Sequence, residues 1–91
     1  MAIAMYFNPR SFNAAQYEEV DAALEEAGAR TPAARTVHVC FGDGDNLQVF
    51  DVWESQEDFD EFGETLMPIL AEKGIDPGEP MVAPVQSVIF P

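Results

Sequence analysis

The sequence predicts an α+β fold in which a four-stranded antiparallel sheet carries two helices on one face. Four short apolar segments and two helical segments follow one another in the order strand, helix, strand, strand, helix, strand. The chain has 91 residues, which is enough for one domain and not for two. Its apolar content of 47% is that of a folded chain rather than a disordered one. We therefore expect a single domain over residues 1–91.

The first strand and the first helix are expected in the N-terminal third of the chain. The strand covers AIAMYF, from about Ala2 to Phe7, and ends before an Asn-Pro pair. The helix begins after Asn13, an N-cap residue with Gln16 as its capping-box partner, and ends at Gly28. Its apolar face consists of Tyr17, Val20 and Leu24.

The middle and last parts of the chain supply two strands, a helix and a final strand. RTVHVCF and LQVFDVW flank the turn GDGDN. Ser55 caps the second helix, which ends at Gly74. The core face of that helix consists of Phe59, Phe62, Leu66, Ile69 and Leu70. The last strand is expected over MVAPVQSVIF, and Pro84 within it indicates an edge strand or a bulge.

This order of elements is the ferredoxin-like βαββαβ arrangement. Right-handed crossovers place both helices on one face of its sheet. An even-numbered loop within GDGDN sets Val39 opposite Phe50 and keeps one face of the hairpin wholly apolar. The same register sets His38 directly opposite Asp51, close enough for an imidazole–carboxylate hydrogen bond.

The two faces of the predicted sheet differ in character. The mixed face is expected to carry His38, Cys40, Asp51 and Trp53, together with Tyr6 and Asn8 of the first strand. The apolar face is expected to carry Ile3, Met5, Phe7, Val37, Val39, Phe41, Phe50 and Val52. Two helices cannot cover both faces, so we expect a second copy to cover the apolar one and the protein to be a homodimer.

The chain resembles the dimeric α/β-barrel superfamily, and within it the antibiotic-biosynthesis-monooxygenase-like branch. The resemblance covers nearly the whole chain and rests on the element order and on VFDVWESQEDFDEF, a strand that ends in Trp-x-Ser and runs into an acidic-aromatic helix. It implies a homodimer whose ligands lie in a cleft between sheet and helices. It also implies a cofactor-independent monooxygenase, or an isomerase, acting on an aromatic or polyketide-like compound.

Haem-degrading monooxygenases of this branch use an Asn, a Trp and a His. Asn8 and Trp53 match the first two, but the place of the histidine on the second helix falls near Gly63. His38 lies on a strand and does not replace it. We therefore expect neither haem nor another cofactor, and no metal.

The candidate catalytic residues are His38 and Asp51, which could form a general base held in one tautomer by a carboxylate. Trp53, Tyr6, Asn8 and Cys40 are the candidate substrate-binding residues. Each has a plain structural alternative: a self-satisfied polar pair, a core aromatic residue or an inert buried thiol. The protein as a whole could accordingly be a binding or housekeeping homodimer without catalysis.

The composition limits the kinds of partner that the protein is expected to bind. The formal net charge is −13, from 17 acidic and four basic residues, which disfavours nucleic acid and anionic membrane surfaces. No apolar run approaches a membrane span, and MAIAMYFNPR lacks the features of a signal peptide. With a single cysteine and no disulfide framework, we expect a cytoplasmic protein.

Overall fold

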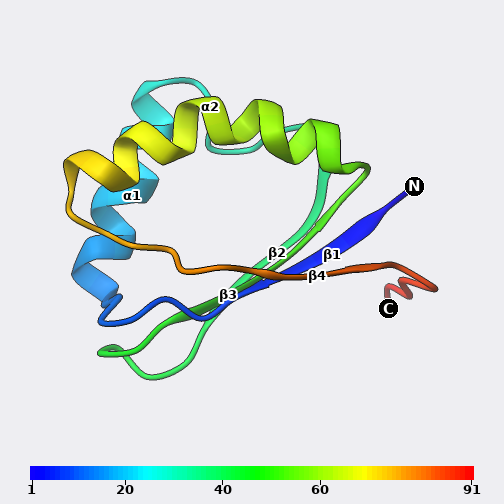
Figure 1. Ribbon diagram of the computed structural model, residues 1–91, viewed down its shortest axis with the longest axis horizontal. Coiled ribbons are helices and arrows are strands. Elements are labelled where there is room, and N and C mark those ends of the chain that lie inside the picture. Colours follow the sequence, from blue (N-terminus) through cyan, green and yellow to red (C-terminus); the bar gives the residue numbers. More distant parts are fainter.

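A computed structural model describes residues 1–91 and has the predicted order of elements. These are β1 (Ile3–Phe7), α1 (Ala14–Glu26), β2 (Arg35–Phe41), β3 (Gln48–Trp53), α2 (Gln56–Glu72) and β4 (Met81–Pro84). The strands form one antiparallel sheet in the order β2-β3-β1-β4, and both helices lie on the same side of it (Figure 1). The ferredoxin-like prediction is confirmed, including β1 beside β3 and Pro84 on an edge strand.

The helix ends follow the local sequence signals. Asn13 accepts from the backbone N–H of Gln16, and the Gln16 side chain accepts from the Asn13 N–H, which completes the predicted capping box. At the other end of α1, Gly28 has a φ of 73° and closes the helix through the N–H groups of Gly28 and Ala29. Neither helix has the length and apolar character needed to cross a bilayer.

The hairpin has the register predicted from its even loop. Val39 pairs with Phe50 and His38 pairs with Asp51. The only irregularity lies at the start of β2, between Arg35 and Val37. The hairpin therefore keeps its two faces distinct over the length that positions the site.

The predicted orientation of β1 is wrong. β1 pairs with β3 so that Met5 lies opposite Asp51 and Tyr6 lies opposite Phe50. Ile3, Met5 and Phe7 are consequently buried on the helix side, and Tyr6 faces the open side. Both sets of alternate residues in AIAMYF are apolar or small, so alternation alone does not orient this strand, whereas the core under the helices requires its larger side chains.

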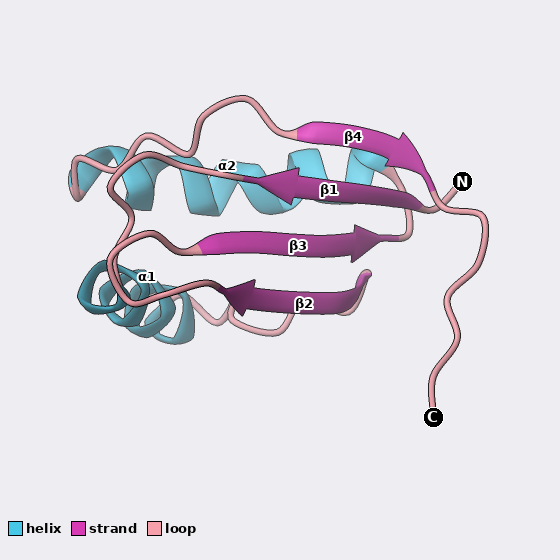
Figure 2. Cartoon of the chain, turned by 90° about the horizontal axis from the view of Figure 1, so that it is seen from below, coloured by secondary structure: helices cyan, strands magenta, loops and turns pink.

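The last strand is shorter than predicted. β4 ends at Pro84, and one further hydrogen bond joins the Val85 N–H to the Ala2 carbonyl. β4 runs antiparallel to β1, which begins at Ile3, so residues beyond Val85 pass the end of their only partner. The segment 85–91 then leaves the sheet and crosses its end (Figure 2).

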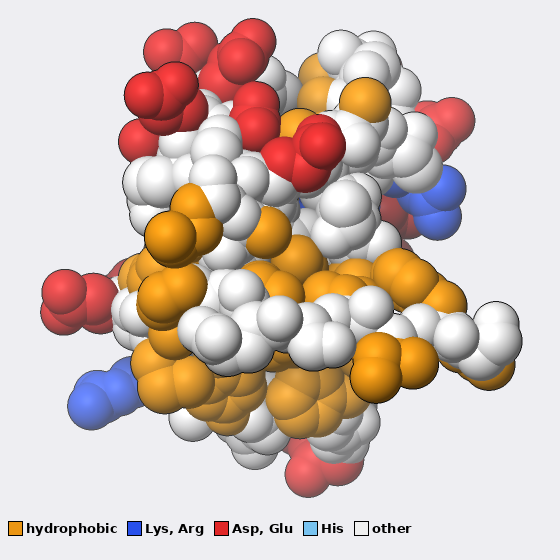
Figure 3. All heavy atoms as spheres, turned by 90° about the vertical axis from the view of Figure 1, so that its right-hand side faces the viewer, with side chains coloured by type: hydrophobic (Ala, Val, Ile, Leu, Met, Phe, Trp, Pro, Cys, Tyr) orange, Lys and Arg blue, Asp and Glu red, His pale blue; other side chains and the backbone are white.

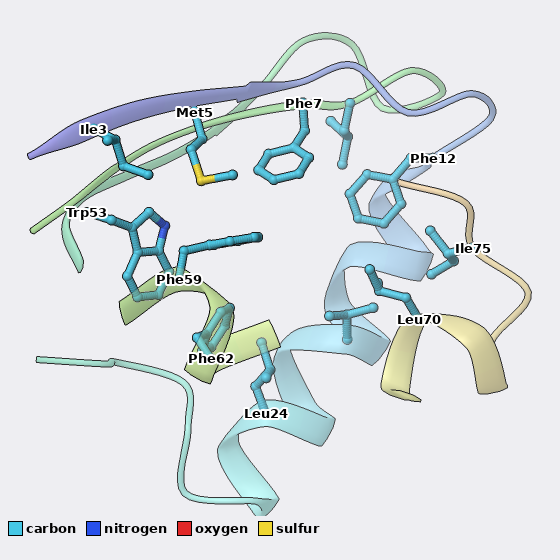
Figure 4. Close-up of a cluster of buried hydrophobic side chains, with 12 residues drawn as sticks. Ile3, Met5, Phe7, Phe12, Leu24, Trp53, Phe59, Phe62, Leu70 and Ile75 are labelled. Carbon is cyan, nitrogen blue, oxygen red and sulfur yellow. The ribbon is translucent and has the colours of Figure 1, made fainter. Parts of the chain in front are cut away.

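The hydrophobic core lies between the sheet and the two helices. Side chains of β1 and β3 point toward side chains of α1 and α2 (Figure 4). Trp53 and Met5 are its most deeply buried large residues, with 0% and 1% exposure. Trp53 contacts Phe59 and Phe62 of α2, with ring centroids 5.6 and 5.1 Å apart. The core therefore ties β3 to α2 directly beside the polar residues of the sheet.

The opposite face of the sheet, which we call the open face, carries no charged residue. Its strand residues are Ala4, Tyr6, Val37, Val39, Phe41, Gln48, Phe50, Val52, Met81 and Ala83. Val39, Phe41 and Phe50 are each at least 36% exposed, whereas Val52 is only 4% exposed and lies near the segment 85–90. Acidic side chains gather on the helix side, and hydrophobic ones gather at the level of the sheet (Figure 3).

Candidate functional site

A cavity of about 100 Å³ lies between the sheet and the two helices. Most of its wall is apolar, with Phe7 and Val49 from the sheet, Val20 and Leu24 from α1, and Phe62 from α2. The polar residues in its wall are Tyr17, Asp21, Arg30, Arg35, His38 and Asp51. A cavity of this size is large enough for water and approaches the roughly 150 Å³ that holds one benzene ring.

His38 and Asp51 form the pair that the hairpin register predicts. His38 Nδ1 lies 2.6 Å from Asp51 Oδ1, and the side chains are 26% and 6% exposed. The strand pleat points both toward the helices because they are opposite residues on neighbouring strands. The pairing prediction is therefore confirmed, while a catalytic role for the two residues stays a prediction.

Trp53 completes the environment of the carboxylate. Its Nε1–H donates to Asp51 Oδ2 over 3.3 Å, so each carboxylate oxygen accepts one hydrogen bond. A carboxylate accepts but does not donate, so the hydrogen on Nδ1 of His38 points to Asp51. The Nε2 atom of a neutral His38 is then left as an acceptor.

Tyr17 supplies the donor to that acceptor. Its hydroxyl lies 2.9 Å from His38 Nε2, a distance at which the O–H of Tyr17 donates when the imidazole carries its one hydrogen on Nδ1. The result is a continuous chain of hydrogen bonds from Tyr17 through His38 to Asp51 and Trp53. Burial is the main cause that raises the pKa of Tyr17 above its ordinary value of 10.0, so the hydroxyl is neutral near pH 7.

Tyr17 is the site residue that the sequence analysis missed. The helical spacing places it on the core face of α1 together with Val20 and Leu24, where an aromatic residue is expected for packing alone. The hydroxyl of Tyr17 could have identified it as a site residue, because a buried tyrosine usually has a hydrogen-bond partner for its hydroxyl. His38, the only histidine in the chain, was the obvious candidate for that partner.

Two arginines also line the cavity, although the whole chain has only four basic residues. Arg30 Nε donates to both oxygens of Asp21 over 3.0 Å, and this bond raises the pKa of Arg30. Arg35 makes no salt bridge; its one side-chain hydrogen bond goes to the Arg30 carbonyl oxygen, 2.9 Å away. The Arg35 guanidinium lies over the rings of Trp53 and Phe62, 5.9 and 5.7 Å from their centroids.

The predicted substrate-binding residues lie outside the cavity wall. Tyr6 is on the open face, where its hydroxyl donates to Gln48 and its ring stacks near Phe41, so its predicted place beside His38 is wrong. Asn8 is exposed beyond the end of β1. Cys40 is on the helix side but packs against the core, and burial raises the pKa of its thiol. Trp53 is fully buried beneath Asp51 and presents no free ring face to a ligand.

Metal-ligating side chains are not clustered in this protein. No group of three or more His, Cys, Asp or Glu residues is arranged to hold a metal ion. Both ring nitrogens of His38 already have partners, Asp51 and Tyr17.

The hydrogen-bonded chain from Tyr17 through His38 to Asp51 can instead move a proton, because each donor in it faces an acceptor.

Comparison with known proteins finds likeness in structure rather than in sequence. No family model and no curated protein matches the chain. A proposed antibiotic biosynthesis monooxygenase from Chloroflexus aurantiacus is similar in structure, with a TM-score of 0.69 at 17% identity over 99% of this chain and 98% of that one.

Two further structures agree. A variant of SnoaB, a cofactor-independent oxygenase from Streptomyces nogalater, gives a TM-score of 0.67 at 14% identity over 97% and 96% of the two chains. Rv0793 from Mycobacterium tuberculosis gives 0.59 at 18% identity over 97% of each. Agreement over whole chains at such low identity is agreement of fold. The chain therefore has the ferredoxin-like fold of the antibiotic-biosynthesis-monooxygenase-like proteins.

Proposed function

We propose that this protein is a cofactor-independent oxygenase that acts on a small phenolic or enolic compound bound between the sheet and the helices. The observation that carries the proposal is the hydrogen-bonded chain of Tyr17, His38 and Asp51 in the wall of a largely apolar cavity. The fold shared with SnoaB, itself a cofactor-independent oxygenase, supports the reaction class.

The proposed chemistry begins with a proton transfer from the substrate to Tyr17. As the Tyr17 oxygen takes the substrate proton, its own hydrogen passes to Nε2 of His38, 2.9 Å away. The imidazolium formed is stabilised by the Asp51 carboxylate at 2.6 Å. The substrate anion then adds dioxygen at a ring carbon that carries hydrogen, and the peroxide takes the proton back from the imidazolium through Tyr17 to give a hydroperoxide. The hydroperoxide loses water, so a phenol and O₂ give a quinone and H₂O.

The cavity favours this chemistry because its wall is largely apolar. An apolar wall lowers the local dielectric constant, so the electrostatic effect of Asp51 on the imidazolium is stronger than it would be in solvent. The neutral state of Tyr17 also suits a relay, since burial raises its pKa and holds the proton on the oxygen until a substrate arrives. Asp51 acts through His38 and is a positioning residue in this scheme.

The test is oxygen consumption with a panel of monocyclic and bicyclic phenols, followed by identification of the product. Tyr17→Phe and His38→Ala should each reduce turnover by about 10²- to 10⁴-fold, the usual size of a general acid–base contribution. Tyr6→Phe is the matched control, because it removes the same hydroxyl from the opposite face of the sheet. Full turnover in Tyr17→Phe would contradict the proposal.

We further propose that two copies associate through the open face. Val39, Phe41 and Phe50 are exposed there, and the sheet carries no charge on that side. In a chain of net charge −13, self-association through any charged face would be opposed by repulsion. The open face is therefore the surface on which a second copy meets least electrostatic resistance.

The non-catalytic alternative, a ligand-binding homodimer, uses the same cavity. This alternative predicts that phenols bind without oxygen consumption, and that Tyr17→Phe lowers their affinity by no more than one hydrogen bond.

Haem binding is tested separately, by titrating the protein with haem. We expect no ligated Soret band, since the imidazole of the sole histidine is engaged on both sides.

A further inference from the structure

We infer that the cavity takes an aromatic acid, and that the Arg35 guanidinium binds its anionic group. This inference rests on the proposed function and adds the charge class of the substrate. Basic residues are rare in this chain, which has four of them against 17 acidic ones. Two of the four, Arg30 and Arg35, nevertheless line the same cavity. A partly buried cation in a largely apolar wall loses part of its hydration, which an anionic ligand would replace.

Arg35 is the cation in this wall without an anionic partner. No carboxylate lies within salt-bridge distance of it, and its single side-chain hydrogen bond ends on the Arg30 carbonyl. A guanidinium has five N–H donors, so most of those on Arg35 remain free. Asp51, the buried carboxylate of the same wall, is already occupied by His38 and Trp53.

Arg30, the other arginine of the cavity wall, already has anionic partners in the protein. It donates to both oxygens of Asp21, has Glu25 at 3.8 Å, and is exposed. Its charge is therefore balanced by the protein itself and screened by solvent. The anion-binding role falls to Arg35 alone.

The Arg35 side chain is also held in place for such a role. Its guanidinium lies over Trp53 and Phe62, within the range of cation–π attraction. A planar, weakly hydrated guanidinium that is stacked on rings loses little freedom when it binds a carboxylate through two parallel hydrogen bonds. Its charge also reaches Tyr17, whose pKa it lowers against the larger effect of burial.

Cavity size and local charge define the ligand further. About 100 Å³ is space for roughly one small ring, with a substituent directed to the mouth. The wall contains two acidic residues, Asp21 and Asp51, and two basic residues, Arg30 and Arg35, so its formal charge is zero within a chain of charge −13. An aromatic carboxylate with a phenolic hydroxyl matches two polar groups of the wall. Its carboxylate would bind the Arg35 guanidinium, and its hydroxyl would contact the Tyr17 hydroxyl.

The experiment compares acids with their neutral amides. The three positional isomers of hydroxybenzoate and the corresponding hydroxybenzamides are titrated by calorimetry, with the fluorescence of Trp53, the only tryptophan, as a second readout. At low salt, at least one acid should bind about 10- to 100-fold more tightly than its amide, the usual effect of a charged hydrogen bond. The preference should shrink as salt is added.

Three variants locate the preference. Arg35→Gln should abolish it, Arg35→Lys should keep part of it, and Arg10→Gln, the matched loss of an exposed cation, should leave it unchanged. Amide affinity and thermal stability report whether Arg35→Gln still folds with its cavity intact. Equal affinity for acids and amides, absence of binding, or a preference that survives in Arg35→Gln would overturn the inference.

The inference and the proposed function fail in different ways. If phenols are oxidised regardless of their charge and Arg35→Gln has no effect, only the role of Arg35 is lost. If acids bind through Arg35 but no phenol consumes oxygen, only the oxygenase proposal is lost.

Discussion

Asp51 is tolerated inside the protein because both of its oxygens accept hydrogen bonds from neighbours. His38 donates to one oxygen and Trp53 to the other, and the side chain is 6% exposed. A buried carboxylate without these partners would be strongly destabilising. At the scale of single residues, the site is thus built around one satisfied charge and the imidazole that it orients.

Asp51→Asn should lower the free energy of unfolding by about 1–3 kcal/mol, because an amide has only one oxygen to accept two donors and its NH₂ group meets the other one. Chemical denaturation measures the change. Asp45→Asn is the control, since it removes the same charge from an exposed turn. Equal stability of the two variants would show that the buried hydrogen bonds contribute nothing.

Tyr17 should ionise at higher pH than a free tyrosine. Burial raises its pKa above 10.0, so the folded state holds the proton where the unfolded state has lost it. The contribution of Tyr17 to stability is therefore complete below about pH 10 and is lost as pH rises toward the folded value. Alkaline titration of phenolate absorbance in Tyr6→Phe, which leaves Tyr17 alone, measures it. A midpoint at or below 10 would contradict the expectation.

At the scale of elements, the helices are stabilised by their caps and by the core, and Gly63 is a weak point of α2. Gly63 is a buried glycine in the interior of α2, and nothing lies within 4 Å of the Cβ that a larger residue would add. Glycine in a helix interior carries an entropic cost relative to alanine. The local structure of α2 therefore leaves room for stabilisation.

Gly63→Ala should raise the free energy of unfolding by about 0.5–1 kcal/mol. Gly28→Ala is the matched control, because it also has open space around the added Cβ but requires a φ of 73°. It should destabilise by about 1–2 kcal/mol. Thermal or denaturant melts of the pair would separate backbone conformation from packing, and effects of the same sign would refute this account.

The hairpin and the caps could be predicted from sequence because their causes are local. Loop parity and one apolar face fix the register that joins His38 to Asp51. The orientation of β1 could not be predicted, because neither alternate set of AIAMYF is clearly polar. The Tyr17–His38 bond depends on how α1 packs over β2, which helical periodicity does not specify.

At the scale of the whole molecule, charge and hydrophobicity are separated. Acidic side chains gather over the helices (Figure 3), whereas the strand residues of the open face carry no charge and are partly exposed. The segment 85–90 lies near only part of that face and leaves Val39 and Phe41 in solvent. A monomer with this surface would be prone to association.

We expect a dimer at micromolar concentration by sedimentation. Phe50→Glu should convert it to a monomer, because it places a charge in the centre of the open face. Met67→Glu, on the exposed surface of α2, is the control and should remain dimeric. A wild-type monomer at these concentrations, or a dimer in Phe50→Glu, would exclude the open face as the interface.

The position of β1 in the sheet also determines when the fold can be completed. β1 is synthesised before every other strand, yet it lies between β3 and β4, and β4 is synthesised after them all. As the chain is made, one edge of β1 therefore waits unpaired until Met81–Pro84 has been added. Such an edge can pair with strands of other nascent chains. Folding of this protein on the ribosome should consequently be late and abrupt, and chains that stop before β4 should aggregate.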